Sequence, residues 1–365
     1  MAATPKTLFT PVQVGNLHLP NRIFLAPLTR SRAGPTHVPN ALMAEYYAQR
    51  ASGGLLIAEA TQIRPNASAF YGEPGIYTAE QIAGWKHVTD AVHAKGGRIF
   101  LQIWHGGRAV HPALNGGDTT EVVSTAAVAI DTSIHTPLGK LPNAVPRALD
   151  ASELPAYVAS YADAATSALK AGFDGVEVHA ANGYLIDQFL RDGTNTRTDD
   201  PKYGNASLST RSQLLNDVLA AVIAAVGTPE KVGVRFSPLN SYNDMHDSDP
   251  AALSEHVAKL AQHYNLAYVH VMRSSFSPVT SQVDIVPIFR KNFKNILIAN
   301  MGYSKDEANK AIADGAVDAV AFGTQFLANP DLPERFLKNA TLNSPDPSTF
   351  YGGAEKGYTD YPTLA

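Results

Sequence analysis

The feature that most constrains the fold is an eightfold alternation of short apolar runs with stretches of helical period. The apolar runs are rich in β-branched and aromatic residues, which is typical of buried strands. An amphipathic segment follows each run, and this order favours parallel strands joined by helical crossovers. The predicted strands are Ile23–Pro27, Leu55–Ala60, Arg98–Ile103, Gly175–His179, Val232–Phe236, Ala267–Met272, Ile296–Ala299 and Ala319–Phe322.

Eight such units predict an α/β fold, a closed (β/α)8 TIM barrel. A doubly wound open sheet is the alternative, but no Gly-x-Gly-x-x-Gly follows the first strand. The predicted helices span 41–51, 78–95, 151–171, 209–226, 250–263, 283–293, 305–314 and 332–339.

Two segments fall outside the alternation. Residues 8–21 mix apolar residues with Gly15 and Pro20, which predicts a hairpin or lid before the barrel. The stretch from about 104 to 149 is rich in Gly, Pro, Thr and His and is too long for an ordinary connector, so we expect a functional insertion with a small hairpin. Residues 1–365 are otherwise predicted to form a single domain, since we find no linker and no internal repeat.

Composition excludes several classes of protein. The formal net charge of −4 argues against general nucleic-acid binding, and the absence of cysteine excludes thiolate catalysis and cysteine-ligated metals. No apolar run is long enough for a membrane helix. The N-terminus, Met-Ala-Ala-Thr-Pro-Lys, lacks the layout of a signal peptide, which predicts a cytoplasmic protein.

Three polar residues follow the fourth predicted strand closely. His179, Asn182 and Tyr184 fall within six residues at its carboxyl end, the face of a barrel where active sites lie. A histidine, an amide and a phenol can together hold a carbonyl oxygen and supply a proton. A structural role is the alternative for His179 taken alone.

Other strand ends add polar groups to the same rim. Thr29 and Gln102 lie there, and Arg235 sits within the fifth strand. A buried arginine needs an anionic or acceptor-rich partner. Either an internal ion pair or a cofactor would provide one, and Gln102 suits the same cofactor.

The loops after the seventh and eighth strands are where barrels commonly bind phosphate. They read Asn300-Met-Gly-Tyr-Ser304 and Gly323-Thr-Gln-Phe326, and Gly302 and Gly323 would let backbone amides approach an anion. A metal site is not expected, because His105, His111 and His179 lack the helical spacing of a zinc site and have no carboxylate at ligand spacing.

The chain resembles the Old Yellow Enzyme family, the FMN-dependent ene-reductases, nearly from end to end. The matching motifs occur in order and include Ala26-Pro-Leu-Thr-Arg30, Gln102-Ile-Trp-His-Gly-Gly-Arg108, the run from Gly172 to Leu190, Gly233-Val-Arg-Phe-Ser-Pro238 and Ala328-Asn-Pro-Asp-Leu332.

The resemblance implies a role for each matching position. Asn182 and His179 would bind the carbonyl or nitro oxygen of the substrate, and Tyr184 would be the proton donor. Trp104, Phe70 and Tyr351 would shape the substrate pocket. The positions implied to contact FMN are Pro27, Leu28, Thr29, Ala60, Gln102, Arg235, Asn300, Met301, Gly302, Gly323 and Thr324.

The implied reaction uses NAD(P)H to reduce FMN, which then passes hydride to the β-carbon of an α,β-unsaturated carbonyl, nitro or quinone substrate while Tyr184 protonates the α-carbon. The implied partners are therefore small molecules, with neither nucleic acid nor membrane, and the protein would be a monomer or homodimer. Within enzymes, the alternative is another FMN barrel, resembling a dihydroorotate dehydrogenase or a nitronate-oxidising enzyme.

The chain departs from the family pattern around the FMN phosphate. Thr324 stands where the family usually has arginine, and Met301 where many members have glycine. These changes support a further alternative, a degenerate barrel that has lost FMN and acts as a binding protein. Together with Ser237-Pro-Leu-Asn240, the missing arginine resembles the trypanosomatid branch of the family.

Overall fold

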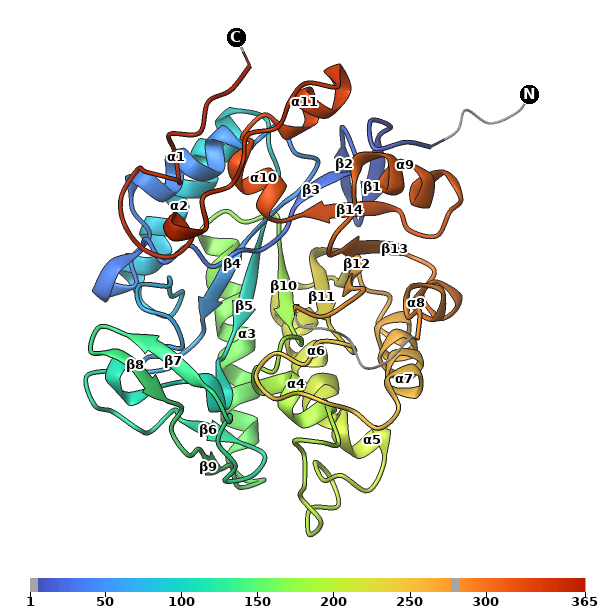
Figure 1. Cartoon of the computed structure of the whole chain (residues 1–365). Helices are drawn as coiled ribbons and strands as arrows, with labels where there is room; N and C mark the ends of the chain where they lie inside the picture. The colour runs from blue at the N-terminus through green and yellow to red at the C-terminus, as the bar shows by residue number, and fades with distance from the viewer. Residues whose placement is uncertain (1–5, 277–282, 365) are drawn as a thin grey trace.

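The computed structural model describes residues 6–276 and 283–364. Within these ranges, eight parallel strands close into a barrel, in chain order, with β14 pairing β3 to complete the ring (Figure 1). The (β/α)8 prediction is confirmed. Residues 1–5, which carry most of the N-terminal sequence behind the cytoplasmic prediction, lie outside the described ranges. The barrel strands are β3 (Ile23–Leu25), β4 (Leu56–Gln62), β5 (Ile99–Trp104), β10 (Gly175–His179), β11 (Val232–Phe236), β12 (Tyr268–Met272), β13 (Ile296–Asn300) and β14 (Ala319–Phe322).

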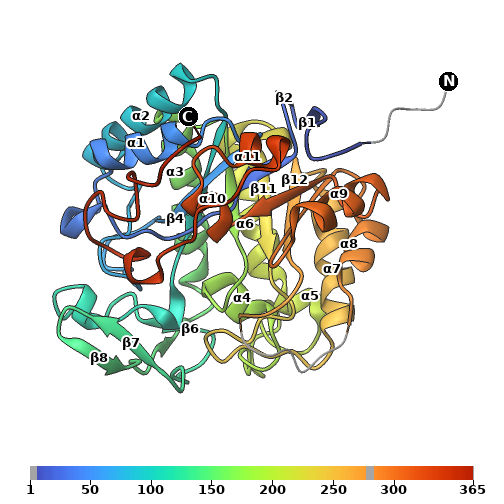
Figure 2. The ribbon, with the colours of Figure 1, turned by 45° about the horizontal axis from the view of Figure 1, so that its top comes forward.

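Helices surround the barrel and bury their apolar faces against it (Figures 1 and 2). Local sequence sets their ends: Thr78 and Gln81 form a capping box at the start of α2, and Gly227 ends α6 with a φ of 81°. The helices are α1 (Ala41–Gln49), α2 (Ala79–Ala94), α3 (Leu154–Lys170), α4 (Leu185–Leu190), α5 (Leu208–Arg211), α6 (Gln213–Val226), α7 (Pro250–His263), α8 (Val286–Asn292), α9 (Lys305–Ala313), α10 (Thr324–Ala328) and α11 (Leu332–Lys338). Among the described residues, no helix has the length and apolar character needed to cross a membrane.

The N-terminal hairpin closes one end of the barrel. Its strands β1 (Val12–Val14) and β2 (Leu17–Leu19) pair antiparallel, as predicted. They pack in one apolar cluster with Phe24, Phe100 and Tyr268, which lie at the amino ends of barrel strands. Of the two forms predicted for this segment, the hairpin is therefore the one observed, and it plugs the bottom of the barrel, away from the carboxyl ends of the strands.

The insertion after β5 forms a separate lobe beside the barrel, at the lower left of Figure 1. Its predicted hairpin is present as β7 (Ser133–Thr136) and β8 (Gly139–Pro142), which pair antiparallel. A second pair, β6 (Val123–Ser124) and β9 (Arg147–Ala148), is parallel and joins the two ends of the lobe.

Three helical details differ from the prediction. The segment from 180 to 208, where no helix is predicted, contains α4, and the loop after β14 contains α10. Both have fewer than seven residues, and α4 is buried on every side, so no amphipathic period could reveal it. The helix predicted at 209–226 is divided at Ser212 into α5 and α6.

Candidate active site

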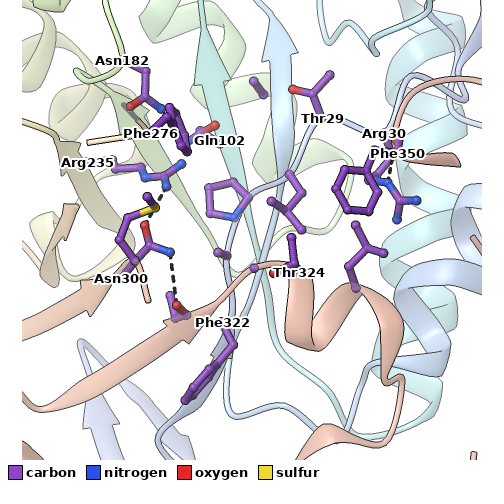
Figure 3. A pocket seen from close by; sticks show the side chains of 18 of the residues that line it. Thr29, Arg30, Gln102, Asn182, Arg235, Phe276, Asn300, Phe322, Thr324 and Phe350 are labelled. Atoms are coloured by element: carbon purple, nitrogen blue, oxygen red, sulfur yellow. Dashed lines mark hydrogen bonds between the residues drawn. The ribbon is translucent and has the colours of Figure 1, made fainter. Parts of the chain in front are cut away.

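A cavity of about 580 Å³ opens at the carboxyl ends of the barrel strands. It brings together residues that are more than three hundred positions apart in the sequence, because parallel strands end at one rim and the C-terminal segment returns to it. In Figure 3 Gln102, Arg235 and Asn182 project from one wall, and Thr324 lies farther along the pocket. Predicted residues that line it are Pro27, Leu28, Thr29, Ala60, Phe70, Gln102, His179, Asn182, Tyr184, Arg235, Asn300, Met301, Gly302, Gly323, Thr324 and Tyr351.

His179 ends β10 and is buried to 3% exposure at the cavity wall. The backbone N–H of Ala181 donates to its Nδ1 at 3.2 Å, so Nδ1 is an acceptor. Burial, helped by the charges of Arg235 and His270, holds the pKa of His179 well below its usual range. The ring is therefore neutral, with its proton on Nε2, and it can donate one hydrogen bond.

Asn182 lies close to His179 in the sequence and has a left-handed backbone conformation. Its φ is 58°, which asparagine tolerates better than most residues. Its side-chain oxygen accepts a hydrogen bond from Asn240 Nδ2 at 2.8 Å. The Asn182 amide hydrogens are consequently left to face the cavity. His179 and Asn182 thus offer two donors from one strand end.

Tyr184 completes the group, with its ring edge-on to His179 at 5.1 Å between centroids. Burial raises the pKa of Tyr184 well above its usual range, and the nearby Tyr242 and Tyr351 raise it further. The phenol therefore keeps its proton at neutral pH and can donate it.

Trp104 does not line the cavity, whereas Phe70 and Tyr351, which were predicted with it to shape the substrate pocket, do. Its ring is fully buried and packs perpendicular to that of Tyr184 at 5.1 Å. Residues of the inserted lobe, Ala109 and Ile130, cover it in one apolar cluster. Trp104 supports the Tyr184 ring from behind.

Arg235 projects from β11 into the cavity, 6% exposed (Figure 3). Its Nη2 donates to Asn300 Oδ1 at 3.1 Å, while its Nε finds no partner among the described residues. No carboxylate of the described chain lies within ion-pair distance of it. The geometry favours the cofactor alternative over an internal ion pair.

Gln102 is held by a buried anion beneath the cavity. Its Nε2 donates to Glu177 Oε1 at 2.7 Å, and Glu177 Oε2 pairs with His270 Nδ1 at 3.0 Å. All three side chains are at most 1% exposed. Because the Gln102 amide nitrogen donates to Glu177, the carbonyl oxygen of the Gln102 side chain faces the cavity.

Glu177→Gln is expected to weaken FMN binding roughly tenfold, about 1.4 kcal/mol, since hydrogen bonds to charged groups contribute about that much. The new amide could turn either its oxygen or its nitrogen toward Gln102, so the Gln102 side chain would lose its fixed orientation. The buried charge near Arg235 would also be lost. Fluorescence titration of apoprotein with FMN measures the effect. Glu230→Gln, an exposed change at the opposite end of the barrel, is the control, and equal affinities in the two variants would contradict the role of Glu177.

Backbone forms the part of the cavity where the sequence predicts phosphate binding. Met301 and Gly302 both have positive φ, at 85° and 71°, and Gly323 precedes the first turn of α10. Backbone N–H groups in a turn of this kind can bind an anion. The exposed Thr324 adds a hydroxyl but no charge.

These features fit FMN. The unpartnered Arg235 Nε and the Gln102 carbonyl match the acceptor and donor groups of a flavin pyrimidine edge, and the Met301–Gly302 turn suits its phosphate. A neutral apolar ligand would leave the buried Arg235 Nε without an acceptor, which is costly.

Residues that line the cavity and were not predicted as site residues include Tyr242, Phe276, Arg30 and Phe350. Tyr242 and Phe276 lie in loops after β11 and β12, where no local pattern marks them. Arg30 was noticed only as part of a motif; its Nη2 and Nε donate to the carbonyls of Gly357 and Phe350, which ties the C-terminal segment to the rim.

The histidines considered for a metal have other partners. His105 Nε2 pairs with Glu121 at 3.0 Å, and His111 Nε2 contacts the Pro142 carbonyl at 3.1 Å, so both anchor the inserted lobe. Across residues 6–276 and 283–364, no group of three or more potential ligands is arranged to hold a metal ion.

Comparison with known proteins places this geometry in context. Residues 7–343 match the sequence pattern of the NADH:flavin oxidoreductase / NADH oxidase family. A probable flavin mononucleotide-dependent alkene reductase of Leishmania infantum is 46% identical over 100% of both chains.

Solved structures agree. Morphinone reductase in complex with tetrahydroNAD is 46% identical, with a TM-score of 0.92 over 99% of this chain and 98% of that one. The old yellow enzyme from Trypanosoma cruzi is 41% identical, with a TM-score of 0.93 over 98% and 99%. These similarities are too close to one another to separate the trypanosomatid branch from the rest.

Proposed function

The chain belongs to the NADH:flavin oxidoreductase / NADH oxidase family, and we propose that His179, Asn182 and Tyr184 carry out its alkene reduction. The enzyme is an FMN-dependent oxidoreductase of the alkene reductase type, with a nicotinamide as reductant. The observation that carries the proposed residue roles is the meeting of two oriented donors and a protonated phenol at one cavity wall.

The two donors polarise the substrate. When an activated alkene takes up hydride at its β-carbon, negative charge grows on the carbonyl or nitro oxygen. Neutral His179 Nε2–H and the Asn182 amide would bind that oxygen, and donors fixed in advance stabilise such charge without reorganising. Bound FMN supplies the hydride after receiving one from the nicotinamide.

Tyr184 would deliver the proton to the α-carbon. Its raised pKa keeps the phenol protonated, and Trp104 and His179 hold the ring between them at 5.1 Å on each side. The anion left after transfer would need a proton from solvent, which can enter through the outer part of the site.

The substrates we propose are enones, quinones and nitroalkenes with room for a large substituent. A second cavity of about 900 Å³ shares Phe70, Tyr184, Tyr242 and Tyr351 with the first and continues to the β7–β8 hairpin. Phe70 and Tyr351 stack at 5.7 Å at this junction. Planar, extended substrates suit such an entrance.

The two alternative functions raised by the sequence are less well supported than alkene reduction. A dihydroorotate dehydrogenase-like or nitronate-oxidising barrel would not need the oriented pair of donors with Tyr184. The degenerate binding protein was proposed because of Thr324 and Met301, but Met301 has a positive φ of 85° beside Gly302, so the loop still turns where glycine is usual. FMN dependence among the relatives also opposes that reading.

Product analysis tests the proposal. With NADH and cyclohexenone in the absence of oxygen, we expect cyclohexanone as the product, with one molecule formed per NADH consumed. Formation of cyclohexenol would mean that the carbonyl carbon accepts hydride, and the roles given to His179, Asn182 and Tyr184 would be wrong.

Thr324→Arg is expected to tighten FMN binding about tenfold at low salt, because a guanidinium at the start of α10 would form charge-assisted hydrogen bonds with the phosphate. Titration of apoprotein at low and high salt measures the effect, which screening should reduce. Leu337→Arg adds the same charge at a site that is 62% exposed on α11 and serves as the control. A Thr324→Arg protein with unchanged affinity would show that the phosphate lies elsewhere.

We also propose that residues 1–365 form one FMN-binding domain and that the protein is cytoplasmic, as a monomer or homodimer. For the domain, support comes from the C-terminal segment, where Tyr358 stacks on Tyr46 of α1 at 4.2 Å. For location and assembly, the support is the sequence alone.

A further inference from the structure

We propose that Asn240, a residue outside the cavity, is a positioning residue that fixes the direction of the Asn182 amide. The inference rests on the proposed function, because it concerns the donor that Asn182 presents to the substrate oxygen. Asn240 lies in the loop after β11, is fully buried and does not line the cavity.

The hydrogen bonds of Asn240 determine which end of its amide is oxygen. The backbone N–H groups of Tyr242 and Phe276 both donate to its Oδ1, each at 3.3 Å, and the Ser275 hydroxyl donates to the same atom at 3.0 Å. A backbone N–H can only donate. The atom that receives them must be the carbonyl oxygen, so Nδ2 occupies the other end.

That other end meets Asn182. Asn240 Nδ2 donates to Asn182 Oδ1 at 2.8 Å. Turning the Asn182 amide over would bring two NH₂ groups together at this distance and leave a buried donor without its acceptor, which is unfavourable. The backbone donors therefore fix Asn240, Asn240 fixes Asn182, and the Asn182 donor points into the cavity.

The main chain of Asn182 is held by different residues. Its N–H donates to Ser237 Oγ at 2.8 Å, and its carbonyl accepts from Asn243 Nδ2 at 3.0 Å. Neither contact involves the side-chain amide. Asn243 thus touches the same residue as Asn240 without setting its donor direction, which makes it a matched control.

The Asn240 amide connects the Asn182 donor to the loops that form the cavity wall. Tyr242 and Phe276 line the cavity, and both give their backbone N–H to Asn240. Movement of either loop away from Asn240 would weaken the constraint on Asn182, because Asn240 Oδ1 would lose part of its donors. The direction of the substrate-binding donor is in this way tied to the loops that border the substrate.

Asn240→Asp tests the proposal, since a carboxylate keeps the acceptor for the two backbone donors but cannot donate to Asn182. The Asn182 amide should then turn its nitrogen toward the new carboxylate and its oxygen toward the cavity. We expect calorimetry on the holoenzyme to give at least tenfold weaker binding of p-chlorophenol, and cyclohexenone reduction to slow by a similar factor. Asn240→Ala leaves the Asn182 amide free to turn without adding a charge, so it should lower phenol affinity by a smaller factor. This variant also tests the proposal if the aspartate variant does not fold. Asn243→Asp loses a hydrogen bond to the main-chain carbonyl of Asn182 but leaves its side-chain amide held by Asn240, so the loss of phenol affinity should be smaller than in Asn240→Asp.

A double-mutant cycle separates positioning from general damage. Asn182→Gly removes the amide and suits the left-handed backbone. If Asn240 acts through Asn182, adding Asn240→Asp to Asn182→Gly should cause no further loss of phenol affinity. Additive losses, or unchanged affinity in both Asn240 variants, would overturn the inference. Failure of the unmodified enzyme to form cyclohexanone would instead refute the proposed function, and the calorimetric cycle would still decide the coupling.

Discussion

Replacing Tyr184 by phenylalanine is expected to slow the reduction of cyclohexenone by on the order of 10²–10⁴, the usual contribution of a positioned proton donor. The change removes only the hydroxyl, and Trp104 and His179 would still hold the ring in place. Rapid mixing of the NADH-reduced enzyme with cyclohexenone measures the step. Reduction of the flavin by NADH needs no proton from Tyr184 and should keep its rate within a few-fold.

The contrast between the two half-reactions is the critical readout for Tyr184. Tyr161→Phe removes a hydroxyl from another fully buried tyrosine, on α3 and outside the cavity, and should leave both steps unchanged. Equal slowing of both steps in Tyr184→Phe would show that the residue supports the site as a whole. An unchanged rate with cyclohexenone would assign the proton to another group or to water.

His179→Ala is expected to lower the rate with cyclohexenone by about 10²–10³, since removing one donor from an oxyanion site typically has this effect. It should also weaken the binding of p-chlorophenol, whose oxygen would occupy the same position. His18→Ala, an exposed change, is the control. Unchanged phenol affinity would remove His179 from the oxygen-binding site.

The pH dependence gives a second check on His179. Burial, Arg235 and His270 favour the neutral ring, so its pKa in the fold lies well below that of the unfolded chain. Phenol affinity should therefore show no titration near pH 6.5, the usual value for histidine. The same pKa difference affects stability. As the pH falls below about 6.5, the unfolded chain binds a proton at His179 that the folded chain does not, so this histidine increasingly destabilises the fold.

Much of the fold could be predicted because its signals are local. The strands β10, β11 and β14 and the helix α7 begin and end where the sequence predicts, since apolar runs and capping residues mark their limits. The helix α4 could not be found in this way, because six residues buried on all sides have no polar face. The hairpin was predicted, but which end of the barrel it would close depends on packing that no local pattern records.

In the candidate site too, residues marked by a local pattern could be predicted and residues placed by long-range contacts could not. Residues at strand ends, such as His179 and Gln102, were predicted to meet because the barrel brings strand ends to one rim. Glu177 and Asn240 were missed, because their roles depend on hydrogen bonds to residues 75 and 58 positions away. Trp104 was placed in the pocket on resemblance, while in the fold the inserted lobe covers it.

The visible absorbance spectrum of the purified protein, recorded before and after NADH is added without oxygen, tests the central claim most directly. We expect a flavin spectrum that NADH bleaches and that cyclohexenone then restores, because the cavity binds FMN and an activated alkene at one face. A protein that stays colourless after incubation with excess FMN would contradict the account. It would mean that Arg235, Gln102 and the Met301–Gly302 turn do not form a flavin site.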